Sequence, residues 1–122
     1  MIVSRKRVLL VDDEPGILKV ISIKLRISGF GVITAHGGQE ALNLLKTESP
    51  DIVLLDVIMP GIDGFEVLQQ LRAFSKLPVI VFSARSSVAE QALSLGASDF
   101  ILKPFLPEEL AEKIKETIRR SS

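Results

Sequence analysis

The chain has 122 residues, 47% of them hydrophobic, and its 15 basic and 15 acidic side chains give a formal net charge of zero. This length and composition predict one folded domain, residues 1–122, with a buried core, and the balanced charge argues against direct binding of nucleic acid by this domain. The absence of cysteine excludes disulfides and thiolate metal sites and fits a reducing compartment, the cytoplasm, and no apolar stretch reaches the ~20 residues that a membrane-spanning helix needs.

Two kinds of apolar segment alternate along the chain. Short apolar runs bounded by turn residues predict five buried strands, at residues 7–11, 31–35, 51–56, 78–82 and 100–102. Apolar residues at three- and four-residue spacing predict helices that begin near Pro15, Gly38, Asp63, Val88 and Pro107. Gly29 is expected to end the first helix and Asp63 to cap the third. The alternation predicts an α/β domain, a parallel sheet with helices on both faces joined by right-handed crossovers.

The residues at the ends of the predicted strands are unusual. Asp12 and Asp13 follow the first strand, and Asp56 ends the third. Ser83 follows the fourth strand, and Lys103 follows the fifth. Each residue alone would be an ordinary cap, turn or surface residue, but the carboxyl ends of parallel strands share one edge of the sheet, where ligands bind in open α/β folds. The sequence therefore predicts one cleft that holds three carboxylates, a hydroxyl and an ammonium.

The predicted cleft has the chemistry of a phosphoryl-transfer site. Two carboxylates ~4 Å apart repel each other by roughly 4 kcal/mol at an effective dielectric constant near 20, so a cation must offset their charge. An oxygen-only cluster favours a hard divalent ion, most simply Mg²⁺. A carboxylate beside Mg²⁺, Lys103 and Ser83 is equipped to attack phosphorus, because the metal and the lysine neutralise the charge that develops on the phosphoryl oxygens.

Five motifs make the sequence resemble the receiver domain of response regulators in two-component signal transduction, the CheY-like superfamily. The motifs are VLLVDDE at 8–14, LLDVIMPGIDG at 54–64, VIVFSA at 79–84, GASDF at 96–100 and KPF at 103–105. The resemblance covers about residues 6–120, and the motifs are specific in this order and spacing. It implies a (βα)5 doubly wound, flavodoxin-like fold with strand order 2-1-3-4-5.

The resemblance also implies a role for each residue of the predicted cleft. Asp56 is implied to be the phosphoacceptor and also a ligand of Mg²⁺. Asp12, Asp13 and the backbone carbonyl of Ile58 are implied to be the other protein ligands of the metal. Lys103 is implied to bind the phosphoryl group.

Three further implied features concern the conformational switch. Ser83 matches the switch hydroxyl and Phe100 the switch aromatic residue, and the Lys103–Pro104 peptide bond is implied to be cis. In the family, the hydroxyl moves toward the phosphoryl group and the aromatic ring turns inward. This movement reshapes the face formed by the fourth helix, the fifth strand and the last helix.

The implied function is a signalling switch phosphorylated by a sensor histidine kinase or a phosphotransfer protein. Such a domain catalyses only its own phosphorylation and dephosphorylation and is not a turnover enzyme. Ile58 and Arg85, two residues after Asp56 and Ser83, carry no carboxylate or amide to orient a water, so slow self-dephosphorylation is expected. The implied output is either a stand-alone receiver or a C-terminal effector domain absent from this chain, and a homodimer through the switching face is a further implied partner.

The main alternative is a receiver-like interaction module that works without phosphorylation. A flavin- or nucleotide-binding module would need a Gly-rich or Ser/Thr-rich loop after the first strand, where Asp12, Asp13 and Glu14 instead repel a bare phosphate. A metal-dependent phosphatase with an aspartate nucleophile would resemble a pattern with a second acid at position 58, where this chain has isoleucine. The full set of acids, hydroxyl and lysine favours phosphorylation over these alternatives.

Overall fold

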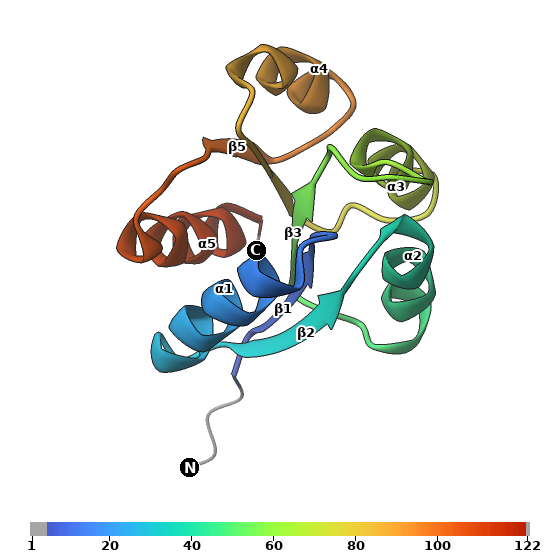
Figure 1. The fold of residues 1–122 in the computed structure, drawn as a ribbon. Helices are drawn as coiled ribbons and strands as arrows, with labels where there is room; N and C mark the ends of the chain where they lie inside the picture. Colours follow the sequence, from blue (N-terminus) through green and yellow to red (C-terminus); the bar gives the residue numbers. More distant parts are fainter. Residues whose placement is uncertain (1–4, 122) are drawn as a thin grey trace.

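The computed structural model describes residues 5–121; residues 1–4 and 122 of the predicted domain lie outside the described residues. Five parallel strands form one sheet in the order β2-β1-β3-β4-β5 (Figure 1). The strands are β1 (Arg7–Val11), β2 (Gly31–Ala35), β3 (Ile52–Asp56), β4 (Val79–Ser83) and β5 (Asp99–Leu102). The predicted doubly wound sheet and its strand order are confirmed.

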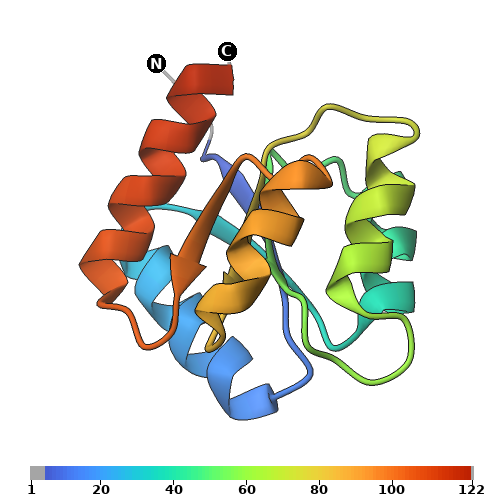
Figure 2. The same cartoon turned by 90° about the horizontal axis from the view of Figure 1, so that it is seen from above.

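Helices cover both faces of the sheet. They are α1 (Pro15–Ile27), α2 (Gly38–Thr47), α3 (Gly64–Arg72), α4 (Ala89–Ser94) and α5 (Pro107–Ser121). Helices α1 and α5 pack on one face, and α2, α3 and α4 pack on the other, as the view in Figure 2 also shows. Within residues 5–121, none of the helices is both long and apolar enough to cross a membrane.

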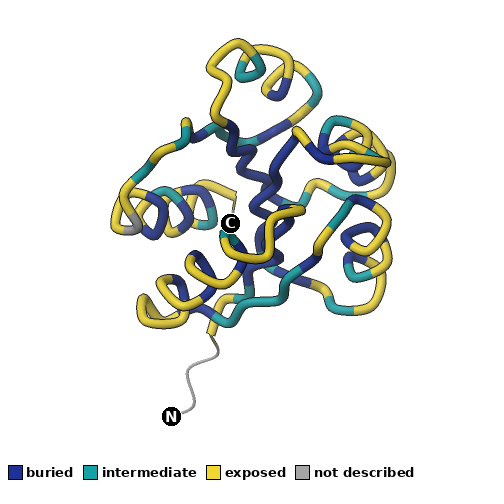
Figure 3. The backbone as a smooth tube through the Cα atoms, in the orientation of Figure 1, coloured by how far each residue is buried: buried dark blue, intermediate teal, exposed yellow. Residues whose placement is uncertain are grey.

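The side chains of the central strands alternate between two apolar cores. Leu9 and Val11 of β1 face α2, α3 and α4, whereas Val8 and Leu10 face α1 and α5. Every residue of β3 and β4 is buried, as is usual for parallel strands that are covered on both faces. Figure 3 shows these strands as a dark blue centre. The carboxyl ends of the central strands therefore emerge from a densely packed interior, which fixes the residues that follow them.

Two residues form the helix ends that the sequence predicts for them. Gly29 lies just beyond α1 with a φ of 98°, in the left-handed region that glycine adopts without a steric cost. Asp63 lies just before α3, and its Oδ1 accepts a hydrogen bond of 3.0 Å from the backbone N–H of Glu66. This cap fixes the start of α3 beside the end of β3.

Several predicted boundaries differ from the structure. Strand β4 begins and ends one residue later than predicted, because Pro78 has no N–H for the ladder and Ser83 pairs with Leu102 of β5. The fourth helix was predicted to begin at Val88, but residues Ser86–Val88 form a 3₁₀ turn, η1, and α4 is shorter. Serine and valine are weak helix formers, which explains the tighter turn before α4. Strand β3 begins one residue later than predicted, and β5 one residue earlier.

Candidate functional site

The strand order creates a switch point between β1 and β3. From β1 the chain crosses to β2 on one side of the sheet, whereas β3 lies on the other side of β1. The connections that leave β1 and β3 lead to α1 and α3, which cover opposite faces. Ligands of open α/β sheets bind in the crevice that opens at such a point, outside the carboxyl ends of the strands. Asp12 and Asp13 follow β1, and Asp56 is the last residue of β3, so all three acids lie at this crevice.

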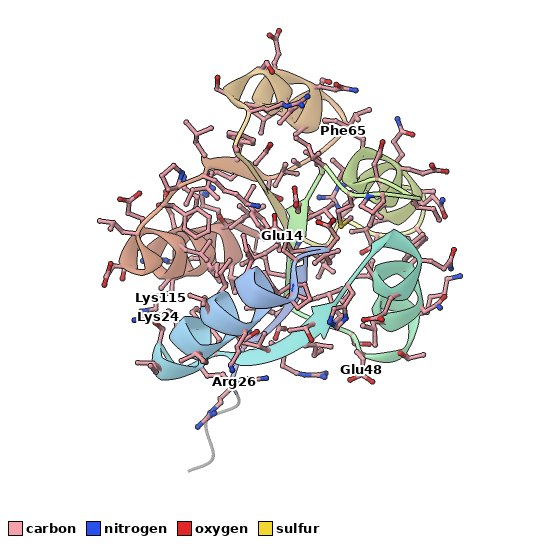
Figure 4. All side chains as sticks on the ribbon, viewed as in Figure 1. Glu14, Lys24, Arg26, Glu48, Phe65 and Lys115 are labelled. Carbon is pink, nitrogen blue, oxygen red and sulfur yellow. The ribbon has the colours of Figure 1, made fainter. Side chains whose placement is uncertain are left out.

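Three carboxylates converge in the crevice. One oxygen from each of Asp12, Asp13 and Asp56 lies within 4.8 Å of the others. Asp12 and Asp56 are buried, whereas Asp13 is exposed. Backbone N–H groups orient the two buried acids, since Glu14 donates to Asp12 Oδ1 at 2.9 Å and Ile58 donates to Asp56 Oδ1 at 3.0 Å. Figure 4 labels Glu14, in the connection between β1 and α1. These bonds occupy one oxygen of each buried acid and leave Oδ2 to face a cation.

Lys103 supplies a cation to these acids. Its Nζ lies 3.3 Å from Asp12 Oδ2 and 3.7 Å from Asp56 Oδ2, and its side chain is 20% exposed. The backbone N–H of Lys103 donates a 2.8 Å hydrogen bond to the carbonyl oxygen of Ser83, which ties the end of β5 to the end of β4. The peptide bond from Lys103 to Pro104 is cis. The crevice thus holds one ammonium against three carboxylates, and a further cation would offset the remaining negative charge.

Burial raises the pKa of Asp56 from 3.8 to about 6. Desolvation of the charged carboxylate is the largest cause of this rise. The hydrogen bond from the Ile58 N–H and the charge of Lys103 lower the pKa, and the negative charges of Asp12 and Asp13 raise it. A cation added to the crevice would favour the charged form of Asp56, which is the nucleophilic form.

The residues predicted to form the switch lie on the next two strands. Ser83 is buried at the end of β4, and its Oγ accepts a 3.1 Å hydrogen bond from the backbone N–H of Arg85. Phe100 is partly buried in β5 and packs against the core on the side of α2, α3 and α4. Ile58 and Arg85 are both exposed. The structure thus brings Asp12 and Asp56 into contact with Lys103 and places Ser83 at the end of β4, the strand next to the one that ends in Asp56. Phe100 lies one strand further along, in β5.

Two further residues shape the crevice and did not emerge from the sequence as site residues. The ring of Phe82 lies beneath the ammonium of Lys103, with Nζ 4.7 Å from the ring centroid. Gly64 lies so close to β3 that a Cβ there would overlap backbone atoms of Asp56 and Val57. A glycine directly after a helix cap is a weak signal of close backbone approach. Phe82 stands in an apolar run, where nothing separates it from an ordinary core residue.

The crevice fits a hard divalent cation. Its donors are carboxylate oxygens close enough for one ion to contact all three, and Mg²⁺ prefers oxygen ligands of this kind. The exposed side of Asp13 gives an ion and its remaining waters access from solvent. Asp12, Asp13 and Asp56 are therefore the side chains that would hold Mg²⁺ here, and the bound ion would neutralise negative charge on a phosphoryl oxygen.

Fold and crevice together define a doubly wound α/β domain with an acidic cluster and a partly buried lysine at the carboxyl edge of its sheet. The family model of the response regulator receiver domain matches residues 8–115. The chain belongs to this family, the receiver domains of two-component signalling.

Curated relatives agree with this assignment. The chain is 43% identical over 121 residues to "Probable transcriptional regulator ycf27" of Guillardia theta, an alignment that covers 98% of this chain and 48% of the relative. It is 41% identical over 119 residues to the alkaline phosphatase synthesis transcriptional regulatory protein PhoP of Bacillus subtilis, covering 95% of this chain and 50% of the relative. The chain therefore spans about half the length of the curated relatives it matches.

Solved structures show the same fold. The receiver domain of the Francisella response regulator 1452 superimposes with a TM-score of 0.90 at 31% identity, covering 97% of this chain and 100% of that one. The response regulator TrrA of Thermotoga maritima, solved in complex with Mg²⁺–BeF, superimposes with a TM-score of 0.86 at 36% identity, covering 92% of this chain and 98% of that one.

Proposed function

We propose that the domain is a phosphorylation-dependent switch in which Asp56 accepts a phosphoryl group from the phosphohistidine of a sensor histidine kinase or a phosphotransfer protein. The observation that carries this proposal is the contact of Lys103 with two buried carboxylates, Asp12 and Asp56, at the switch point of the sheet. The lysine stands where it can neutralise a phosphoryl group on Asp56. The similarity to TrrA, whose structure is described as a complex with Mg²⁺–BeF, supports the same use of the crevice here.

The transfer forms one bond and breaks one. An oxygen of Asp56 attacks the phosphorus, the P–N bond of the phosphohistidine breaks, and the imidazole leaves with the electron pair of that bond. The N–H of Ile58 orients the carboxylate through Oδ1, and Lys103 neutralises charge on the phosphoryl oxygens. Mg²⁺, held by the three acids and the backbone carbonyl of Ile58, would supply further neutralisation. The domain acts on its own side chain and later hydrolyses the product, so we do not expect turnover of a separate substrate.

The response to phosphorylation is proposed to pass through Ser83 and Phe100 to the face formed by α4, β5 and α5. Ser83 would exchange its present bond with the Arg85 N–H for one with the phosphoryl group. On this face Asp99 of β5 and Lys113 of α5 form an ion pair, with Lys113 Nζ 3.1 Å from Asp99 Oδ2. Helix α4 contributes an exposed hydrophobic residue, Leu93. The same face is proposed as the surface for a homodimer or for an effector domain, because the curated relatives are transcriptional regulators about twice as long. We also propose that the domain acts in the cytoplasm, where it would meet its kinase.

The proposal is tested by intact-mass analysis after incubation with acetyl phosphate, with and without Mg²⁺. We expect one phosphoryl adduct that requires Mg²⁺ and is lost completely in Asp56→Asn. Asp63→Asn is a matched control, because Asp63 caps α3 and is not part of the acidic cluster, and the amide oxygen can still accept the capping hydrogen bond. An adduct that persists in Asp56→Asn would refute the role of Asp56.

Absence of an adduct in the wild-type protein would point to the alternative function, an interaction module that works without phosphorylation. Beryllofluoride then separates two causes of that result. Mg²⁺-dependent binding of beryllofluoride would show a competent site that accepts phosphoryl groups only from its own kinase. No binding would favour the interaction module.

Self-dephosphorylation is expected to be slow, with a lifetime of the phosphoryl group well beyond seconds. Ile58 is 45% exposed, and its aliphatic side chain has no hydrogen-bonding atom that could orient an attacking water. Ile58→Asn introduces an amide that can do so, and we expect hydrolysis about tenfold faster. The measurement is the decay of the adduct mass after the phosphodonor is removed. A wild-type lifetime of only seconds would contradict this expectation.

A further inference from the structure

The ammonium of Lys103 has a third partner besides the two carboxylates. Its Nζ lies 4.7 Å from the ring centroid of Phe82, within the range of a cation–π contact. Phe82 is 1% exposed and directly precedes Ser83 at the end of β4. The ring side of the contact is therefore shielded from water, while the Lys103 side chain is 20% exposed. The attraction between a cation and an aromatic face strengthens as water is removed from the contact.

Phe82 is itself held in place by the segment that carries the lysine. The rings of Phe82 and Phe105 meet edge to face, with centroids 6.2 Å apart and planes at 89°. Phe105 is only two residues beyond Lys103, so one short stretch of chain contacts the Phe82 ring through both an ammonium and a second ring. This arrangement gives the ring a defined orientation, with its electron-rich face available to the ammonium.

The contact of Lys103 with the ring differs from its contacts with the carboxylates, because no step of the reaction changes the ring. Phosphorylation changes the charge and shape of Asp56, and a divalent cation in the crevice would compete with Lys103 for Asp12 and Asp56. A phenyl ring neither titrates nor binds such an ion strongly in this place. It can hold the ammonium beside Asp56 while the lysine exchanges a carboxylate oxygen for a phosphoryl oxygen.

We propose that Phe82 is a positioning residue that holds the ammonium of Lys103 in place for phosphoryl transfer to Asp56. This inference rests on the proposed function above. Neighbouring core positions on the same side of the sheet, Ile52, Leu54 and Ile80, are aliphatic and fully buried. An aliphatic residue would therefore satisfy packing at position 82, and the ring face is what the phenylalanine adds.

The test compares Phe82→Leu with Phe30→Leu. Phe30 belongs to the same core cluster and is also buried, but it lies at the opposite end of the sheet, beside the start of β2. We expect Phe82→Leu to slow phosphorylation by acetyl phosphate roughly fivefold at saturating Mg²⁺, which corresponds to about 1 kcal/mol for a cation–π contact whose ammonium is partly exposed. Phe30→Leu should change the rate less than twofold by the same reasoning.

A second variant separates the ring's electrons from its volume. Replacing Phe82 by 3,4,5-trifluorophenylalanine keeps a ring of similar size but withdraws electron density from its face. We expect a rate between those of wild type and Phe82→Leu, and no change when the same analogue replaces Phe30. In NMR spectra, the side-chain methylene protons of Lys103 next to Nζ should show upfield ring-current shifts that Phe82→Leu removes.

The outcomes separate the two proposals. A wild-type adduct combined with unchanged rates in Phe82→Leu and in the fluorinated variant would overturn the positioning role and leave the proposed function intact. Absence of the ring-current shift would overturn the contact itself. No wild-type adduct with acetyl phosphate and no beryllofluoride binding would overturn the proposed function, and the positioning role with it.

Discussion

Replacing Gly64 by alanine is expected to lower the free energy of unfolding by about 3 kcal/mol, the effect of forcing an extra methyl group into a packed interior. Gly64 is the buried first residue of α3, and a Cβ there would overlap the carbonyl oxygen of Asp56 and the Cα of Val57. Both neighbours are backbone, so neither can rotate away. Relief requires α3 to move from β3, which would also displace Asp56. Urea denaturation measures the stability, and the acetyl phosphate assay should show a slower reaction.

Gly16→Ala is the control for this substitution. Gly16 lies in the first turn of α1, and nothing lies within 4 Å of a Cβ built there. Because alanine is the better helix former, Gly16→Ala should leave stability unchanged or raise it by about 0.5–1 kcal/mol. A cost below about 1 kcal/mol for Gly64→Ala would show that α3 does not approach β3 as closely as described.

The stability of the metal-free protein is expected to depend on pH through Asp56. Its pKa is 3.8 in the unfolded chain and about 6 in the folded domain. Between these values the folded state holds a proton that the unfolded state has released, so the contribution of Asp56 to stability falls as pH rises from about 4 to about 6. One pKa unit corresponds to 1.36 kcal/mol, so the full loss is about 3 kcal/mol. Above the folded pKa the loss is complete and constant.

The variant Asp56→Asn separates the contribution of Asp56 to the pH dependence of stability from the contributions of the other acidic residues. The amide keeps the shape of the side chain but has no charge to desolvate. In the presence of a chelator, urea denaturation should find the variant more stable than wild type by up to about 3 kcal/mol at pH 7–8, with the difference vanishing near pH 4. Added Mg²⁺ should reduce the difference at neutral pH. Equal stabilities at pH 7 without metal would show that burial does not penalise the Asp56 carboxylate.

The fold could be predicted because its strongest determinants are local. Alternation of short apolar runs with helical spacing leaves few topologies open, since parallel strands need crossover connections of one hand. That topology also explains why acids far apart in the chain could be predicted to meet. Asp12 follows β1 and Asp56 ends β3, and these strands are neighbours in the sheet, so a prediction of strand ends is also a prediction of proximity.

Other parts of the site depend on contacts that a linear pattern does not encode. The contact of Phe82 with Lys103 depends on which face of β4 the ring occupies and on how the chain turns after β5. The raised pKa of Asp56 depends on how deeply the carboxylate is buried. Helix α4 is short because residues Ser86–Val88 form a 3₁₀ turn instead of a further α-helical turn. Helix propensities of such residues differ by only a few tenths of a kcal/mol, which is too little to predict this boundary from the sequence.

The position of β5 in the sheet gives the domain an uneven distribution of local stability. Strand β5 is at an edge and pairs only with β4, whereas β3 pairs on both sides and is buried throughout. Local opening of an edge strand breaks one ladder of hydrogen bonds, so its free energy is lower than that of opening a central strand. Asp56 ends one of the central strands, while Phe100 belongs to an edge strand. The proposed chemistry is thus anchored on a central strand, and the proposed response begins on an edge strand, where rearrangement requires less free energy.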